Sequence, residues 1–180
     1  MMRYLSGTRE WGIRFSPTGN EVLDTYADAS WKRRELKMKS QSGAVMMLAG
    51  GPIIWFSRKQ KRVAPSTQVA EYIATNEIGR DGLWITNLYE ELGLPVRRPF
   101  HIWCDNQAAI RATENGLNSR GNRFLDLDEE FLVEECQSGR ITIDYIESEK
   151  NTADVFTKLL PRNLFEKHRE KLECDSQKEH

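Results

Sequence analysis

Four carboxylates in this 180-residue sequence lie where strands are expected to end or helices to begin. Asp28 and Asp105 each close a predicted strand, and Asp105 leads straight into a predicted helix. Glu71 falls in the first turns of a long predicted helix, and Asp154 falls in the first turn of a later one. Because sites in α/β proteins form at strand ends and helix starts, the four side chains can meet at one place.

Converging carboxylates predict a site for divalent cations. Their charges repel one another, so such a cluster requires cations, and ligands that are all oxygen favour Mg²⁺ or Mn²⁺ over zinc. Two such ions about 3.5–4 Å apart activate a water and stabilise the leaving oxygen of a phosphodiester. The resulting interpretation is metal-assisted phosphodiester hydrolysis.

Each carboxylate also has a simpler explanation. Asp154 follows Asn151 by three residues, so its role could be limited to favouring a helix N-terminus through the helix dipole. Glu71 could be a solvated helix residue. Asp28 and Asp105 are harder to dismiss, because aspartate is a poor strand former. The residue types alone leave both interpretations open.

The pattern of apolar residues predicts an α/β domain. Strands are expected at residues 21–28, 43–48, 53–56, 100–105 and 141–146. Helices are expected from Ser66 to Gly93, at 106–110 and 125–137, from Asn151 to Pro161, and at 164–172. Three antiparallel strands before the long helix, and further strands after it, imply a mixed sheet with helices packed on its faces.

The charge of the chain is balanced in total but not along its length. Lys and Arg number 26 against 27 acidic residues, and a net charge of −1 argues against a protein that coats nucleic acid or membranes. Residues 31–62 nevertheless hold nine basic residues and one acid, whereas residues 126–150 hold nine acids and two basic residues. This polarity permits a basic nucleic-acid-binding side beside a carboxylate-rich site.

The sequence also predicts a soluble protein inside the cell. The longest apolar stretch, residues 43–56, is interrupted by glycine and proline and is shorter than the roughly 20 residues of a membrane helix. The start lacks the apolar segment of a secretion signal, and the three cysteines lack the spacing of a zinc site. We therefore expect no membrane partner and an intracellular location, in a cytoplasmic particle or in the nucleus.

Several sequence blocks resemble the ribonuclease H domain at the C-terminal end of copia-type LTR retrotransposon Pol polyproteins. These blocks are RYLSGTREWGIRFS, YADASW, KSQSGAVMMLAGGPIIWFSRKQ, AEYIA, LWITNLYEELG, CDNQAAI and NTADVFTKLLPRNLFEKHREKL, and they span nearly the whole chain. The resemblance implies an α/β ribonuclease H-like fold: a five-stranded mixed sheet, three antiparallel strands first, with helices on both faces. It also implies that the catalytic and metal-binding quartet is Asp28, Glu71, Asp105 and Asp154.

The same resemblance implies an activity with its cofactor and partners. The family cuts the RNA strand of RNA–DNA hybrids, leaving a 5′-phosphate and a 3′-hydroxyl, with two Mg²⁺ ions or with Mn²⁺. The expected partners are the hybrid and the reverse transcriptase portion of the same polyprotein. Residues 1–20 are expected to be a remnant of the connection to that portion, residues 21–174 the ribonuclease H domain, and residues 175–180 a disordered tail. The alternative is a catalytically inactive or domesticated nucleic-acid-binding module, because fold does not fix function.

Two groups of residues are candidates for contact with a hybrid, which proteins recognise through its shape, phosphates and 2′-hydroxyls. They are the basic residues Arg58, Lys59, Lys61 and Arg62 and the polar residues Asn106 and Gln107. The basic run could instead be a solvated strand edge, and Asn106 could be the cap of a helix. Cellular ribonucleases H carry a histidine in the loop before the last catalytic aspartate, whereas residues 147–150 of this chain are Glu-Ser-Glu-Lys.

Overall fold

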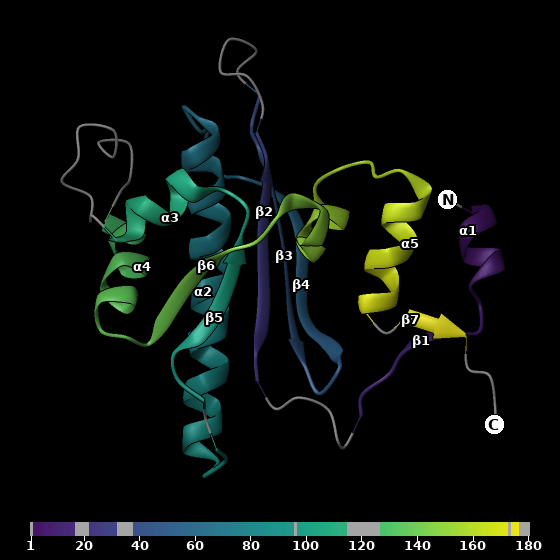
Figure 1. Cartoon of the computed structure of the whole chain (residues 1–180), viewed down its shortest axis with the longest axis horizontal. Coiled ribbons are helices and arrows are strands. Elements are labelled where there is room, and N and C mark those ends of the chain that lie inside the picture. Colours follow the sequence, from purple (N-terminus) through teal and green to yellow (C-terminus); the bar gives the residue numbers. More distant parts are fainter. Residues whose placement is uncertain are drawn as a thin grey trace.

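A computed structural model of the chain describes residues 2–16, 22–31, 38–95, 97–114, 127–172 and 174–176. Its centre is a five-stranded sheet with the strand order β4-β3-β2-β5-β6 (Figure 1). The strands are β2 (Asp24–Ser30), β3 (Gln41–Leu48), β4 (Gly51–Lys59), β5 (Phe100–Cys104) and β6 (Ile141–Tyr145). Each of them lies within a few residues of a predicted strand.

The sheet is mixed, as expected. β2, β3 and β4 pair antiparallel, whereas β5 pairs parallel with β2 and β6 pairs parallel with β5. Ala49 and Gly50 join β3 to β4 with positive φ angles of 52° and 86°, the backbone of a tight hairpin turn. Parallel neighbours need a long connection, and the helix α2 (Thr67–Glu91) lies in the connection from β4 to β5.

Sequence signals set both ends of α2. The Ser66 hydroxyl accepts a hydrogen bond from the Val69 N–H at 3.2 Å, and Gly93, just past the end, has the left-handed φ of 67°. Gly82 permits close packing, because a Cβ there would lie 2.4 Å from Cζ of Phe100. Neither α2 nor any other helix in the described ranges is both long and apolar enough to cross a membrane.

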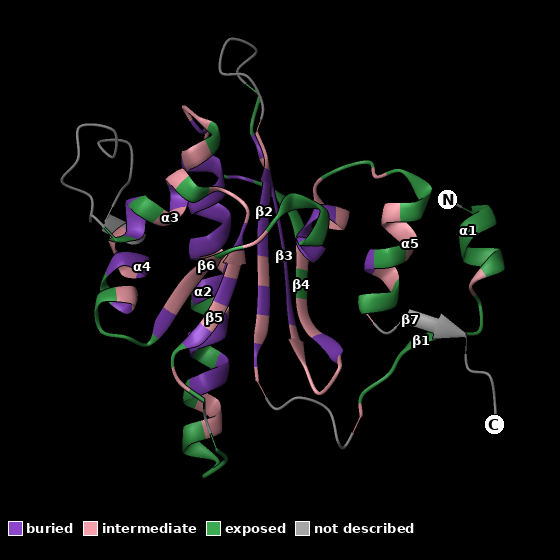
Figure 2. Ribbon diagram, in the orientation of Figure 1, coloured by how far each residue is buried: buried purple, intermediate pink, exposed green. Residues whose placement is uncertain are grey.

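The main hydrophobic core joins α2 to the sheet and to α4 (Leu127–Gln137). Its largest members include Tyr72 and Ile78 of α2, Ile102 of β5, Leu132 of α4 and Ile141 of β6. The short helix α3 (Gln107–Glu114) packs beside α2 and α4. Figure 2 shows that buried residues are concentrated in the central strands and in α2. The core therefore fixes α2 and the strands as one rigid support.

The residues of β2 alternate between the two faces of the sheet. Ala27 belongs to the core that contacts α2, so the side chain of Asp28 points to the opposite face. On that face two short 3₁₀ helices follow β6, namely η2 (Ser148–Lys150) and η3 (Thr152–Phe156), and η3 contacts β2 and β3. Helical elements thus cover both faces, which confirms the predicted fold class.

The segment from Asn151 to Pro161 differs from the helix that was predicted for it. Asn151 does cap the segment, since its Oδ1 accepts a hydrogen bond from the Ala153 N–H at 3.1 Å, but η3 already ends at Phe156. The cause is a tertiary contact: Nδ2 of Asn151 donates to the carbonyl of Ala27 at 2.8 Å and ties the turn to β2. The predicted last helix is present as α5 (Arg162–Lys171).

The two ends of the chain meet beside α5. After α1 (Met2–Gly7), β1 (Trp11–Ile13) pairs antiparallel with β7 (Cys174–Ser176), in a sheet separate from the central one. The guanidinium of Arg169 lies 3.9 Å from the centre of the Trp11 ring, which joins β1 to α5. Residues 175 and 176, predicted to begin a disordered tail, are therefore part of a strand because β1 provides its partner. Residues 177–180 lie outside the described ranges.

Candidate active site

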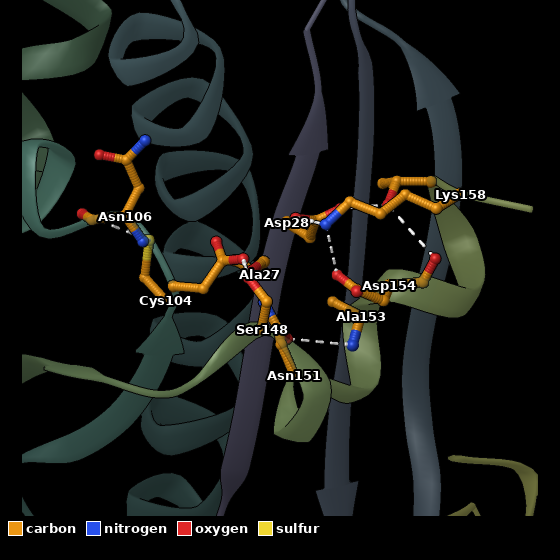
Figure 3. A network of polar contacts seen from close by, with 11 residues as sticks. Ala27, Asp28, Cys104, Asn106, Ser148, Asn151, Ala153, Asp154 and Lys158 are labelled. Carbon is orange, nitrogen blue, oxygen red and sulfur yellow. Dashed lines mark hydrogen bonds and ion pairs between the residues drawn. The ribbon is translucent and has the colours of Figure 1, made fainter. Parts of the chain in front are cut away.

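Asp28 is fully buried on β2, opposite Gly43 of β3. Two groups just after η3 hold its carboxylate. The Thr157 hydroxyl donates to Oδ2, and Nζ of Lys158 donates to Oδ1 at 3.0 Å (Figure 3). A buried carboxylate without such partners would be strongly destabilising. The turn that follows η3 therefore supplies the partners that this buried carboxylate needs.

Gly43 allows η3 to approach the sheet. A Cβ at this position would lie 2.5 Å from Cγ2 of Thr157 and 2.8 Å from Cβ of Phe156, both closer than side chains tolerate. The Ser57 hydroxyl on β4 donates to the carbonyl of Phe156 and fixes the same turn from the neighbouring strand. Nothing in the residue pattern singled out this glycine, because its role depends on a segment more than 100 residues away.

Asp154 lies within η3 and is nearly buried. Its Oδ1 accepts a hydrogen bond from Nζ of Lys158 at 2.7 Å, so one ammonium joins Asp154 to Asp28. Burial raises the pKa of Asp154 to about 6, although the hydrogen bond from Lys158 acts in the opposite direction. The negative charge of Asp28 also contributes to this raised pKa. Two carboxylates therefore share one positive charge.

Asp105 follows directly after β5, at the start of α3. The Ser148 hydroxyl of η2 donates to its Oδ2. Next to it, Oδ1 of Asn106 accepts hydrogen bonds from the N–H groups of Ala108 and Ala109, both at 3.0 Å, so Asn106 is the N-cap of α3. The cap and the serine together fix the direction in which the Asp105 carboxylate points.

Glu71 reaches the site from α2 and is 4% exposed. Burial, and then the charges of Asp28 and Asp105, raise its pKa to about 9, while Lys158 and the Ala29 N–H act in the opposite direction. Within the described part of the chain, Oε2 of Glu71 is buried and has no hydrogen-bond partner. A buried carboxylate oxygen of this kind is suited to binding a cation.

The four carboxylates come together as their positions predicted. Asp28, Asp105 and Asp154 offer oxygen atoms that lie within 4.8 Å of one another. Glu71 and Asp105 form a second group within the same limit, together with the buried Cys104 thiol. Asp105 belongs to both groups. The unpartnered oxygen of Glu71 and the excess of carboxylate oxygens fit divalent cations with oxygen ligands, such as Mg²⁺ or Mn²⁺.

The residues predicted to contact nucleic acid differ in how far they are exposed to solvent. Arg58 lies at the end of β4, where its guanidinium is 3.9 Å from the centre of the Phe56 ring and 3.6 Å from a carboxylate oxygen of Glu77. Lys59 and Lys61 are exposed. Arg62 is partly buried.

Of the two polar candidates, Gln107 is exposed and Asn106 serves as the cap described above. Of the first basic stretch of the sequence, Lys32 to Lys39, residues 32–37 lie outside the described ranges. The predicted contact residues that the structure presents to solvent are therefore Arg58, Lys59, Lys61 and Gln107.

Three residues that contact the carboxylates were not predicted. They are Ser148, Thr157 and Lys158. Lys158 had a local signal, since it follows Asp154 by four residues, a spacing at which opposite charges meet on a helix. Ser148 and Thr157 had none, because only the folding of η2 and η3 onto the sheet brings their hydroxyls to Asp105 and Asp28.

Comparison with curated proteins finds relatives along almost the whole chain, although no protein-family model matches it. The chain is 33% identical over 166 residues to the retrovirus-related Pol polyprotein from transposon TNT 1-94 of Nicotiana tabacum. That match covers 92% of this chain and 12% of the relative. It is also 33% identical over 173 residues to the polyprotein from transposon RE1 of Arabidopsis thaliana, covering 96% and 12%. The chain thus spans about one eighth of the length of these relatives.

Solved structures show the same fold at low identity. LC11-RNase H1, isolated from compost, superposes with a TM-score of 0.53 at 16% identity, covering 76% of this chain and 93% of that one. The structure of LC11-RNase H1 in complex with an RNA/DNA hybrid gives a TM-score of 0.51 at 17% identity, covering 74% and 92%. The N-terminal RNase H domain of rv2228c from Mycobacterium tuberculosis gives 0.51 at 14% identity, covering 84% and 98%. These similarities confirm the predicted architecture.

Proposed function

This chain is a homologue of the retrovirus-related Pol polyproteins of plant transposons and has the ribonuclease H fold, and on that premise we propose that it cleaves the RNA strand of RNA–DNA hybrids. The observation that carries the proposal is the meeting of Asp28, Glu71, Asp105 and Asp154, from four different elements, at one place. In this proposal the chain acts as the ribonuclease H domain of a copia-type element, with the reverse transcriptase portion of its polyprotein as partner. The reaction would take place in a cytoplasmic particle or in the nucleus.

The proposed cofactor is a pair of Mg²⁺ ions, with Mn²⁺ as a substitute, because the ligands are carboxylate oxygens. Asp28, Asp105 and Asp154 would hold one ion, and Glu71 with Asp105 would hold the other. When bound, such ions supply an activated water and stabilise the leaving oxygen of the phosphodiester. Asp105 belongs to both groups of ligands, so this aspartate is the residue on which both sites depend.

The residues of the chain prepare the carboxylates for this task. The hydroxyls of Thr157 and Ser148 each donate to one oxygen of an aspartate, which orients the carboxylates of Asp28 and Asp105. Without a cation Glu71 holds a proton at neutral pH, since its pKa is about 9. Cation binding must therefore release that proton.

The basic end of β4 supports the choice of a nucleic-acid substrate. Ser57 pairs with Gly43, which in turn pairs with Asp28, so Arg58 and Lys59, the last residues of β4, lie at the end of the sheet where Asp28 lies. Lys61 and Arg62 continue from there. We include these four residues, together with Asn106 and Gln107, as the surface that contacts the sugar–phosphate backbone of the hybrid.

A cleavage assay on a hybrid with labelled RNA and DNA strands tests the proposal. The wild-type protein should cut the RNA strand alone, in the presence of Mg²⁺ or Mn²⁺, and leave a 5′-phosphate. Asp105→Asn keeps the size of the side chain but removes a charge shared by both groups of ligands, so cleavage should fall at least about 100-fold. Glu114→Gln, an exposed carboxylate on α3, is the matched control and should cut normally.

Two results would refute the proposal: no cleavage by the wild-type protein with either ion, or unchanged cleavage by Asp105→Asn. Hybrid binding that weakens with salt, without cleavage and without affinity for either ion, would instead identify a nucleic-acid-binding module that has lost its activity.

A further inference from the structure

Lys158 occupies the centre of the group formed by Asp28 and Asp154. Its Nζ lies 3.0 Å from Oδ1 of Asp28 and 2.7 Å from Oδ1 of Asp154. Figure 3 shows the lysine side chain reaching across from the end of η3 to both carboxylates. The two carboxylates are 0% and 6% exposed, whereas the lysine side chain is 36% exposed. Two buried acids thus share one cation that can reach solvent.

The charges at this place are not balanced by Lys158 alone. Asp28, Asp154 and Asp105 offer oxygen atoms that lie within 4.8 Å of one another, so three carboxylates meet beside this lysine. One ammonium carries a single positive charge. A divalent ion brings twice that charge and binds carboxylate oxygens directly. The site therefore has a cation in place that a stronger one can replace.

We propose that Lys158 is a placeholder cation, which occupies the position between Asp28 and Asp154 until a divalent ion displaces it. The inference rests on the proposed function, because it assumes that these carboxylates bind such ions. Both cations would bind the carboxylates of Asp28 and Asp154, so they compete. A placeholder explains how the buried carboxylates remain in place while the chain holds no ion.

The position of Lys158 makes its departure feasible. The residue lies after the last residue of η3, and four flexible methylenes connect its ammonium to the backbone. The ammonium side of this ion pair is partly open to water, so the charge has solvent to move into. Movement of the lysine side chain does not require movement of η3, which Asn151 and Gly43 hold against the sheet.

Metal binding without substrate measures the competition. Lys158→Met removes the ammonium and keeps much of the apolar stem. If Lys158 leaves its position free about one tenth of the time, a competing ion binds the wild type about tenfold more weakly. Calorimetry should therefore show that Lys158→Met binds Mg²⁺ and Mn²⁺ about tenfold more tightly than the wild type. Lys167→Met is the control, because Nζ of Lys167 contacts the backbone carbonyl of Glu149 and no carboxylate in the described residues. Its affinity should equal that of the wild type.

Stability without metal gives a second measurement. In EDTA the Lys158→Met protein should unfold at a lower temperature than the wild type, because Asp28 and Asp154 lose their shared partner. Saturating Mg²⁺ should remove most of this difference. If the variant does not fold without metal, Lys158→Arg keeps the charge and should fold in EDTA, and the labelling experiment below uses the wild-type chain alone.

Displacement itself can be observed by amine labelling and mass spectrometry of the wild-type protein. Acetylation of Lys158 should increase several-fold when Mg²⁺ is added, while acetylation of Lys167 should not change. An affinity that Lys158→Met leaves unchanged or weakens, or labelling of Lys158 that does not respond to Mg²⁺, overturns the placeholder. If hybrid cleavage by the wild type still depends on Mg²⁺, the proposed function survives that result.

A wild type that neither binds metal nor cleaves the hybrid would also be informative. If the wild type binds neither ion and does not cleave the hybrid, the proposed function fails. If Lys158→Met binds Mg²⁺ or Mn²⁺ in that case, the placeholder is supported, because Lys158 then prevents the ion from binding to the wild type. If the variant binds neither ion, the placeholder is overturned.

Discussion

Gly43→Ala tests whether the site depends on close contact between η3 and β3. The added methyl group would lie 2.5 Å from Cγ2 of Thr157 and 2.8 Å from Cβ of Phe156, where carbon atoms normally stay about 3.5–4 Å apart. The turn must therefore move away by roughly 1 Å. Overpacking of this kind costs about 1–3 kcal/mol of unfolding free energy. A displacement of 1 Å in a catalytic group can reduce the rate about 100-fold.

Urea denaturation and the hybrid cleavage assay measure these two effects separately. We expect Gly43→Ala to remain folded, to lose about 1–3 kcal/mol, and to cleave about 100-fold more slowly. Gly12→Ala is the control, because a Cβ at that position of β1 meets no atom within 4 Å. Adding Thr157→Ser to Gly43→Ala removes the nearest clashing carbon but keeps the hydroxyl that binds Asp28, so it should restore part of the loss. Wild-type stability and cleavage in Gly43→Ala would refute the reasoning.

Three further predictions follow from contacts that hold the site. Asn151→Ala removes the hydrogen bond to the buried carbonyl of Ala27, so urea denaturation should show a loss of about 1–3 kcal/mol; a loss below about 0.5 kcal/mol would contradict the anchoring role. Gly82→Ala places a Cβ 2.4 Å from Cζ of Phe100 and should cost about 1–3 kcal/mol, with a melting temperature equal to the wild type as the contrary result. The pKa of Glu71 rises from 4.5 to about 9 in the folded protein, so the folded state holds a proton that the unfolded state has released. In EDTA the free energy of unfolding should therefore fall between about pH 5 and pH 9, and a flat pH profile would be inconsistent with a raised pKa for this buried carboxyl group.

The central elements were predictable because their signals are local. The period of apolar residues identified α2, Ser66 marked its start, and Gly93 marked its end with a left-handed backbone. The hairpin turn at Gly50 was equally clear. These features depend on residues within a few positions of one another. Their agreement with the structure follows from local preference and tertiary packing acting in the same direction.

The errors fall where distant contacts decide the structure. The segment after Asn151 has the apolar residues of a helix, but its bond to Ala27 and its fit over Gly43 favour short 3₁₀ turns. The strand β7 forms because β1 pairs with it from the other end of the chain. Neither contact leaves a periodic pattern in the sequence. Only the three-dimensional arrangement reveals them.

The acidic residues of the site have local sequence signals, whereas the residues that contact them depend on distant parts of the chain. Aspartates at the ends of β2 and β5 are conspicuous, because aspartate is unfavourable there unless a site uses it. The partners of these aspartates are ordinary by composition: Ser148, Thr157 and Lys158 would pass as surface residues in most sequences. Their roles depend on η2 and η3 lying against the sheet. The sequence therefore identifies the carboxylates of the candidate site more easily than it identifies the residues that hold them in place.

The site also shows why a fold tolerates a cluster that opposes its own stability. Burial and mutual repulsion raise the pKa of both Glu71 and Asp154, so the ionised carboxylates oppose folding near neutral pH. Lys158 and the hydroxyls of Thr157 and Ser148 offset part of that cost. Among the described residues, Oε2 of Glu71 has no hydrogen-bond partner. The excess of negative charge is greatest among the carboxylates that would bind a divalent ion. A cation that relieved it would stabilise the fold and complete the site in the same step, so binding and stability should rise together when Mg²⁺ is added.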